Sequence, residues 1–388
     1  MKIDRRNPIH WLRLLGFATS ILLASLARPF RRKNGRKRIL FYGHRLAGNL
    51  WPVYTRLRER YPNAVEVGFI SMDPCYRQAL SLLGESPIAA TSLRAIDWLS
   101  TVDAVVSDHG LHAMQPMVRM RGIKFFDVWH GIPFKGFDGQ DFRVQRRYEQ
   151  AFVASPLMAS VYRERFGFDR TRVTPTGYSR TDILVDMSVD PAEVRREIGV
   201  PENRKVILFA PTWRHDDPIR SSFPFGVDYR EFLEQMEQIA VEHDATLVIR
   251  AHLNSRPENQ RGSEVVRFLQ FSDYPWTERL LLATDVLICD WSSIAFDFLI
   301  LNRPAIFLDV PAPFAKGFTL GRAWRYGRVV QSMDTLKDAV SCATSDPERF
   351  IELYQARARA ARTRLYGGMD DGSATDRCVN RIIDSLGA

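Results

Sequence analysis

The chain has 388 residues, more than one hydrophobic core usually serves, and its 45% hydrophobic and 26% charged residues exclude a disordered protein. Its four cysteines are widely spaced, which excludes a disulfide-rich secreted fold and favours a reducing, cytoplasmic setting. The net charge of +9 predicts an anionic partner. Nucleic acid is not expected, because the chain has neither an RNP-type motif nor zinc-finger spacing.

Residues 1–37 form a predicted membrane-associating segment. The run 14–27 is apolar and uncharged but shorter than the roughly 20 residues of a bilayer span. A basic cluster follows between residues 28 and 38. We favour an interfacial helix, with Trp11 at the level of the lipid headgroups and residues 11–38 on an anionic membrane surface. A signal peptide cleaved near residue 27 and a plain buried helix are the alternatives.

Short apolar runs then alternate with helical stretches, which predicts a parallel sheet covered on both faces. We assign residues 38–185 to an N-terminal Rossmann-like domain. Its expected strands lie within 38–43, 65–71, 103–108, 123–131, 149–155 and 171–177, and its expected helices within 49–61, 76–83 and 156–166.

Residues 186–204 are polar, carry Pro191 and Pro201, and read as a linker with a short helix. A second alternating set in 205–388 predicts a C-terminal Rossmann-like domain. Its expected strands lie within 205–211, 246–252, 264–272, 285–290 and 304–310, and its expected helices within 228–243, 294–301, 347–364 and 374–386. The fold class is therefore α/β, with two doubly wound domains facing a central cleft.

His130 is the first candidate for a catalytic role. It lies in the motif WHGIPFK, directly after a predicted strand, where Gly131 and a proline oppose continuation of a helix. Its imidazole can accept a proton near neutral pH. The alternative is a histidine satisfied by backbone groups in a turn.

His252 ends the strand-like run TLVIRAH in the other domain, so two histidines are expected to face one cleft.

Candidate phosphate-binding residues also follow predicted strands. Ser292 and Ser293, after Asp290, fall at a helix start, where backbone N–H groups attract phosphate, although ordinary N-capping explains them equally well. Thr212 and Arg214 follow another strand, and Arg180 lies near the end of the first domain. Either arginine can bind an anion or form a surface ion pair. No P-loop, GxSxG or HExxH motif is present, and we expect a reaction without a metal.

Five motifs together carry a resemblance to a known family. WHGIPFK, TGYSRTD, APTWR, RAH and DWSSIAFDF resemble the motifs of the CDP-glycerol glycerophosphotransferases of teichoic acid and capsule synthesis. The departures are Leu253, Ser179, Thr181 and Trp291, where the family commonly has Pro, Pro, Asn and Tyr. The resemblance implies a GT-B-like fold, peripheral attachment to the cytoplasmic face of the cell membrane, and no cofactor beyond CDP-glycerol as co-substrate.

The resemblance also implies an activity and residue roles. Glycerol phosphate, or a related polyol phosphate, would pass from its CDP donor to a hydroxyl of a lipid-linked or polymeric glycan, releasing CMP. His130 would be the general base, with Gly131 and Lys135 supporting its loop. His252 would be the second catalytic residue and would hold the donor pyrophosphate. The donor-binding candidates are Ser292, Ser293, Asp290, Arg180, Thr212 and Arg214. Residues 205–388 would then be the CDP-donor-binding domain and residues 38–185 the acceptor-side domain. A GT-B glycosyltransferase or epimerase acting on a nucleotide sugar, and a non-catalytic membrane-bound scaffold, are the competing hypotheses.

Overall fold

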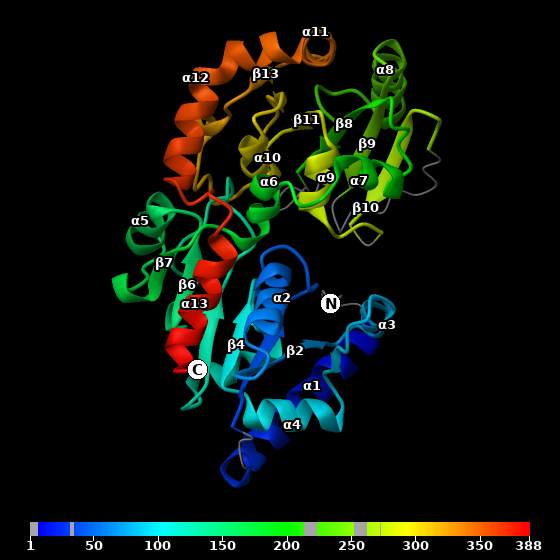
Figure 1. Ribbon diagram of the computed structural model, residues 1–388. Helices are drawn as coiled ribbons and strands as arrows, with labels where there is room; N and C mark the ends of the chain where they lie inside the picture. The colour runs from blue at the N-terminus through cyan, green and yellow to red at the C-terminus, as the bar shows by residue number, and fades with distance from the viewer. Residues whose placement is uncertain (1–6, 32–34, 213–222, 252–261, 272) are drawn as a thin grey trace. The chain divides into compact units, whose positions relative to one another are not determined.

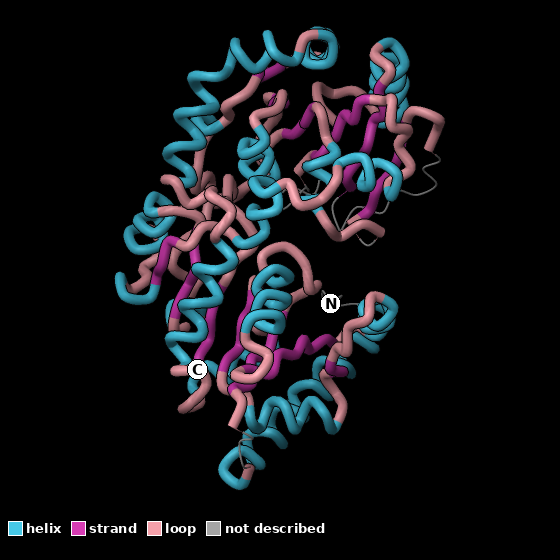
Figure 2. The backbone as a smooth tube through the Cα atoms, viewed as in Figure 1, coloured by secondary structure: helices cyan, strands magenta, loops and turns pink. Residues whose placement is uncertain are grey.

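The computed structural model describes residues 7–31, 35–212, 223–251, 262–271 and 273–388. The chain forms two compact units, each built around one parallel sheet (Figures 1 and 2). Unit 1 contains Met1–His130, Asp138–Arg180 and Ser373–Ala388, and unit 2 contains Gly131–Phe137 and Thr181–Gly372.

The sheet of unit 1 has seven parallel strands in the order β3-β2-β1-β4-β5-β6-β7. The order reverses between β1 and β4, and in doubly wound folds ligands bind at the strand ends beside such a switch point. The strands are β1 (Lys37–Tyr42), β2 (Val65–Ser71), β3 (Ile88–Ala89), β4 (Ala104–Ser107), β5 (Lys124–Asp127), β6 (Gln150–Val153) and β7 (Val173–Pro175).

Helices cover both faces of this sheet because successive strand residues point to opposite sides. Leu40 and Tyr42 of β1 pack with α1, α4 and η2, whereas Ile39 and Phe41 pack with α2, α3 and α13. The helical elements of unit 1 are α1 (Pro8–Ala27), η1 (Arg28–Phe30), α2 (Leu50–Arg60), α3 (Pro74–Leu82), α4 (Leu93–Thr101), η2 (His112–Arg119), η3 (Gln145–Arg147), α5 (Pro156–Glu164), η4 (Arg170–Arg172) and α13 (Ala374–Leu386).

The first helix, α1, is longer than the predicted apolar run because Asn7 caps it and Pro8 begins it. It lies beside α4 (Figure 1) and buries a stripe at helical spacing, Phe17, Ile21 and Ala24, in the core of unit 1. Its length and composition suffice to cross a membrane. The exposed large apolar residues of this segment are Ile9, Trp11, Leu12, Leu15, Leu22, Leu23, Leu26 and Phe30.

The sheet of unit 2 has six parallel strands in the order β10-β9-β8-β11-β12-β13, with its switch point between β8 and β11. The strands are β8 (Lys205–Ala210), β9 (Ala245–Ala251), β10 (Val266–Gln270), β11 (Val286–Cys289), β12 (Ala305–Leu308) and β13 (Arg328–Val330). The helical elements are η5 (Ser179–Thr181), which enters this unit, α6 (Asp182–Asp186), α7 (Pro191–Glu197), α8 (Tyr229–Glu242), α9 (Thr277–Ala283), α10 (Ile294–Phe298), η6 (Leu299–Leu301), η7 (Arg322–Trp324), α11 (Met333–Ser345) and α12 (Pro347–Tyr366).

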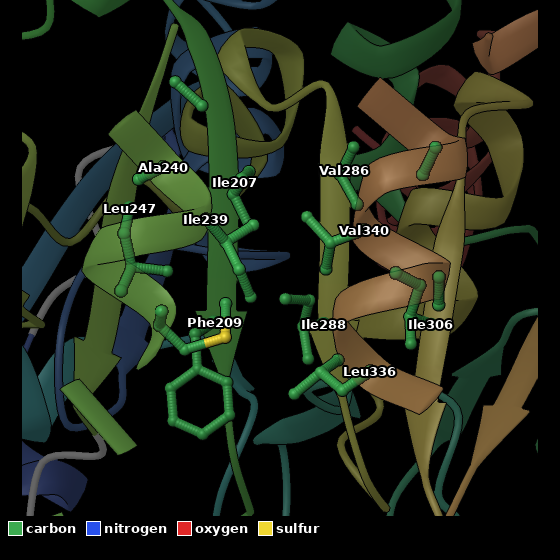
Figure 3. Packing of buried hydrophobic residues seen from close by; sticks show 14 of the residues in the cluster. Ile207, Phe209, Ile239, Ala240, Leu247, Val286, Ile288, Ile306, Leu336 and Val340 are labelled. Atoms are coloured by element: carbon green, nitrogen blue, oxygen red, sulfur yellow. The ribbon is translucent and has the colours of Figure 1, made fainter. Parts of the chain in front are cut away.

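Figure 3 shows how the core of unit 2 is built. Ile207, Phe209 and Ile288 of the sheet face Ile239 of α8 and Val340 of α11, so that two helices cover one face of the strands. These side chains are buried. The core therefore fixes the strands whose ends carry the candidate donor-binding residues.

The unit boundaries differ from the predicted domains in three places. The last helix, α13, buries Cys378, Val379 and Ile382 in the core of unit 1, although it was assigned to the C-terminal domain. The predicted linker belongs to unit 2, where Arg195 of α7 pairs with Asp285 at 2.8 Å. Residues 131–137, assigned to the first domain, also belong to unit 2. Each difference depends on tertiary packing, which strand and helix periodicity do not reveal.

Candidate active site

The loop that carries His130 follows β5 and is held in a strained shape. Trp129 has a φ of 47°, in the left-handed region, which costs a residue with a side chain about 1–2 kcal/mol. The Asp127 carboxylate accepts a hydrogen bond from the Trp129 N–H at 2.8 Å. The buried Asn49 amide donates to the carbonyls of Val128 and Trp129 at 2.9 and 3.0 Å. These hydrogen bonds hold the strained backbone of the turn in place. Backbone strain that is held in this way is typical of functional sites.

Three further histidines gather near His130 in unit 1. His44 follows β1 and His109 follows β4, on the two sides of the switch point, and His112 begins η2. The His109 ring stacks on the His130 ring with centroids 4.3 Å apart. His44 lies 4.7 Å from His109 and 5.6 Å from His112 by the same measure. The site therefore contains a four-histidine cluster of which the motifs predicted one member.

The charges in the cluster set different protonation states. Burial tends to lower the pKa of His109, but Asp108, whose carboxylate lies 2.7 Å from its Nδ1, raises this pKa overall. For His130, desolvation and then the His109 charge lower the pKa well below its ordinary value, although the residue keeps an exposed surface. His109 is thus favoured as the cation and His130 as the neutral imidazole.

The tautomer of His130 follows from its contact with the backbone. Its Nδ1 lies 3.0 Å from the Asp108 carbonyl oxygen. A carbonyl oxygen only accepts hydrogen bonds, so Nδ1 carries the proton and donates it. The Nε2 of a neutral His130 then has a free lone pair, as a general base requires.

Arg180 lies beside this histidine in the same unit. Its Nη1 donates to the His130 carbonyl at 2.8 Å, and its backbone N–H donates to the Asn49 side chain at 3.0 Å. The motifs TGYSRTD and WHGIPFK therefore meet in unit 1 through Asn49. Sequence reasoning grouped Arg180 with the donor-binding residues and did not identify Asn49.

The second half of the WHGIPFK motif is anchored in unit 2. The Phe134 ring stacks on Phe296 with centroids 4.4 Å apart, and the Phe134 carbonyl accepts from the Thr319 N–H at 2.9 Å. The Lys135 carbonyl accepts from the Thr319 hydroxyl at 2.7 Å, and its Nζ lies 5.9 Å from the Phe137 ring centroid. A Cβ at Gly136 would lie 2.3 Å from the Lys316 carbonyl oxygen, so only glycine fits there. These contacts support the predicted role of Lys135 in holding the loop, through its backbone.

In unit 2, Asp290 ties together the two strand ends at the switch point. Its Oδ1 accepts from the backbone N–H of Thr212 at 2.7 Å, from the Thr212 hydroxyl, and from the Trp291 N–H at 2.6 Å. Both Asp290 and Thr212 are buried. These bonds favour a positioning role for Asp290, because a carboxylate repels phosphate.

Ser292 and Ser293 lie directly after this junction and are half-buried. Ser293 is the N-cap of α10, but its side chain makes no capping hydrogen bond. Ordinary capping therefore does not account for its hydroxyl. Arg325, which the sequence did not single out, lies 4.6 Å from the Trp291 ring and pairs with Asp309 at 2.9 Å.

Two candidates, Arg214 and His252, lie outside the described residues, so the predicted meeting of His130 with His252 is not tested. Among the residues that are described, no group of three or more His, Cys, Asp or Glu side chains is arranged to hold a metal ion. His44 and His109 were missed, but a signal existed, because each comes directly after a run predicted to contain a strand.

Two doubly wound units, each with polar residues at the strand ends beside its switch point, are the parts of a GT-B-like fold. The solved structure of a variant of the wall teichoic acid polymerase TagF has this fold, with a TM-score of 0.76 at 20% identity over 96% of this chain and 94% of that one. A co-structure of Staphylococcus aureus MnaA with UDP aligns with a TM-score of 0.57 at 15% identity, over 91% and 97%.

The family described as CDP-glycerol:poly(glycerophosphate) glycerophosphotransferase matches residues 26–384, and the chain belongs to it. It is 27% identical to a teichoic acid glycerol-phosphate transferase of Staphylococcus aureus (strain NCTC 8325 / PS 47), over 67% of this chain and 71% of that protein. It is 28% identical to the teichoic acid ribitol-phosphate polymerase TarK of the same strain but spans 55% of its length. The predicted family, fold class and transferase class are confirmed.

Proposed function

We propose that the chain transfers glycerol phosphate, or a related polyol phosphate, from CDP-glycerol to a hydroxyl of a lipid-linked or polymeric glycan. The observation that carries this proposal is His130, which follows β5 in unit 1, donates from Nδ1 to the Asp108 carbonyl, and has a lowered pKa that favours its neutral form. Family membership supplies the reaction class. TagF has been studied with a CDPG soak, which supports the CDP-linked donor.

The proposed reaction is one displacement at phosphorus. His130 Nε2 takes the proton of the acceptor hydroxyl, and the oxygen attacks the phosphorus that bears the glycerol. The bond from this phosphorus to the oxygen of CMP breaks, and CMP leaves with the electron pair. His109, paired with Asp108, keeps a positive charge beside His130 and favours its neutral form before the attack.

Donor binding is assigned to the strand ends of unit 2. The Thr212 backbone and hydroxyl are fixed by Asp290, which positions the segment that leads to Arg214. Ser292 and Ser293 come after the adjacent strand, β11, and their hydroxyls can donate to a pyrophosphate. His252 and Arg214 complete the proposed set from the sequence motifs. The reaction is proposed to need no metal or cofactor.

Attachment to the cytoplasmic face of the membrane is proposed through α1. Because Phe17 and Ile21 are packed in the core of unit 1, the helix lies along the unit, which supports an interfacial rather than a spanning placement. Three residues of the basic cluster make contacts inside unit 1. Arg28 donates to the Val102 carbonyl, Arg36 to the Val65 carbonyl, and Arg38 pairs with Glu66.

The membrane proposal can be tested with vesicles of phosphatidylglycerol and phosphatidylcholine. Leu15→Gln/Leu26→Gln, which changes two exposed residues of α1, should reduce cosedimentation strongly. Val241→Gln/Leu353→Gln removes the same kind of exposed surface from unit 2 and should leave it unchanged. Equal cosedimentation of both variants and the wild type would contradict the role of α1.

The test of the activity is CMP release from CDP-glycerol by the purified protein, with and without a lipid-linked glycan primer. Primer-dependent release that is lost in His130→Ala supports the proposal. Release from UDP-N-acetylglucosamine but not from CDP-glycerol would favour the nucleotide-sugar alternative. If His130→Ala leaves the cellular phenotype unchanged, the non-catalytic scaffold is favoured.

A further inference from the structure

A cavity of about 510 Å³ opens in unit 1, apart from the strand-end loop of His130. Its walls are η2, which contributes His112, Gln115 and Arg119, and the segment around η3, which contributes Arg143 and Arg147. This volume falls within the range of small-molecule sites, about 300–1,000 Å³. The cavity can therefore hold a substituent as large as a pyrophosphate with an attached sugar.

The lining of this cavity is basic. Among the described residues, three arginines and one histidine line it, and no aspartate or glutamate does. In the described part of the chain, none of Arg119, Arg143 and Arg147 forms an ion pair with a carboxylate. Arg28 and Arg38, by contrast, are used inside the fold. Guanidinium groups bind phosphate oxygens in a forked geometry, so this cavity matches a phosphorylated ligand.

Aromatic rings connect the cavity to the proposed base. His112 lines the cavity, and its Nδ1 lies 2.9 Å from the Tyr42 hydroxyl. The His44 ring lies between the rings of His112 and His109, and His109 stacks on His130. His112 also has a φ of 47°, a strained backbone state that is enriched at ligand sites. A ligand anchored in the cavity can thus extend along this row of rings to His130.

The same wall of the cavity rests on the proposed membrane helix. Met114 and Met117 of η2 belong to the core cluster that contains Phe17 and Ile21 of α1. The Ser25 hydroxyl of α1 lies 3.7 Å from the sulfur of Met120, directly after η2. A lipid tail on a ligand in the cavity would therefore start close to the apolar surface of α1.

We propose that this cavity binds a phosphate group of the acceptor and thereby directs the acceptor hydroxyl to His130. The group is either the pyrophosphate of a lipid-linked primer or a phosphodiester of the polymer, since both present the same oxygens. The inference rests on the proposed function, because it assigns the acceptor of that reaction. It adds Arg119, Arg143 and Arg147 as residues that determine acceptor specificity.

The test compares Arg143→Gln/Arg147→Gln with Arg357→Gln/Arg359→Gln, a control that removes the same charge from exposed positions of α12. Binding of two probes is measured by calorimetry: tri(glycerol phosphate), and a pyrophosphoryl disaccharide on a short prenyl chain. CDP-glycerol binding is measured in parallel. Thermal unfolding verifies that both variants fold.

The cavity variant should bind at least one probe about tenfold or more weakly than the wild type, with CDP-glycerol affinity unchanged. Its binding should also depend less on salt. If the variant loses affinity for tri(glycerol phosphate), the bound group is a phosphodiester of the polymer. If it loses affinity for the prenyl probe, the bound group is the pyrophosphate of the primer.

Three results would overturn the inference. The cavity variant could match the control for both probes, it could lose CDP-glycerol affinity instead, or the wild type could bind neither probe. If the wild type still releases CMP in the last case, the proposed function stands and only the cavity assignment falls. A probe could also bind in a way that depends on the arginines while the wild type releases no CMP. The cavity would then still be a phosphate site, but the proposed function would be wrong.

Discussion

The imidazole rings of His109 and His130 lie 4.3 Å apart between centroids, with an angle of 7° between their planes. Two stacked imidazoles disfavour a positive charge on both, and the Asp108 carboxylate decides which ring holds it. His109 is the ring that Asp108 favours as the cation. Desolvation, and then the charge of His109, lower the pKa of His130 and favour its neutral form. The base after β5 is thus coupled to the charge pair after β4.

Replacing His130 by glutamine should reduce CMP release by about 10²–10⁴-fold, the usual contribution of a general base. Glutamine keeps a similar volume but cannot take the proton. His243→Gln is the matched control, because His243 bonds Ser341 in unit 2, and its activity should be normal. Equal rates for both variants would rule out His130 as the base.

The pH dependence of kcat/KM should follow the pKa of His130, which is stacked on His109. Because the pKa of His130 is lowered below its ordinary 6.5, the acidic limb of the profile should lie below pH 6.5. His109→Gln removes the neighbouring cation and leaves the Asp108 carboxylate, so the pKa of His130 should rise. The acidic limb should then move to higher pH. A limb that stays in place in this variant would show that His109 does not control the base.

Asp127 should make unit 1 less stable as the pH rises. Burial raises the pKa of Asp127 from 3.8 to about 7, so between these values the folded state holds a proton that the unfolded state has released. The free energy of unfolding should fall by on the order of 2 kcal/mol between pH 5 and pH 7 relative to Asp127→Asn.

Urea unfolding at the two pH values measures this difference. Asparagine keeps the oxygen that accepts from the Trp129 N–H but cannot ionise. Asp338→Asn, at an exposed position of α11, serves as the control and should follow the wild type. A parallel pH dependence of the wild type and Asp127→Asn would disprove the protonated state of Asp127.

Thr212→Val should weaken donor binding. The substitution keeps the backbone bond to Asp290 but removes the hydroxyl bond, so Asp290 holds Thr212 at the end of β8 through the backbone bond. We expect the KM for CDP-glycerol to rise about tenfold, with a loss of about 1–3 kcal/mol in stability. Thr344→Val removes a buried hydroxyl bond within α11 and should reduce stability without changing KM. A similar KM in the two variants would contradict a donor site at β8.

Local patterns in the sequence predicted many of the elements closely. The predicted helix at residues 374–386 has the observed bounds of α13, and the strand at 65–71 has those of β2. The strands β3 and β13 were missed, because runs of two and three residues carry too little periodicity. The helix α11 was also missed, although its Ser332–Thr335 capping box is a recognisable start signal.

The candidate site was predicted only in part, because motifs report neighbours along the chain and not across the sheet. His130 and Ser293 were identified from their own segments. His44 and His109 become neighbours only because β1 pairs with β4 at the switch point. Asn49 was missed for the same reason, since its partners lie at Val128, Trp129 and Arg180.

The position of α13 has a consequence for how the protein is made. Cys378, Val379 and Ile382 complete a core whose strands β1 and β2 are synthesised first. On the ribosome, unit 1 must therefore wait for α13 before its core is full, and unit 2 is translated in the interval. A nascent chain that stops short of α13 leaves the histidine cluster on an incomplete scaffold, so the base is held in place only once α13 has been made.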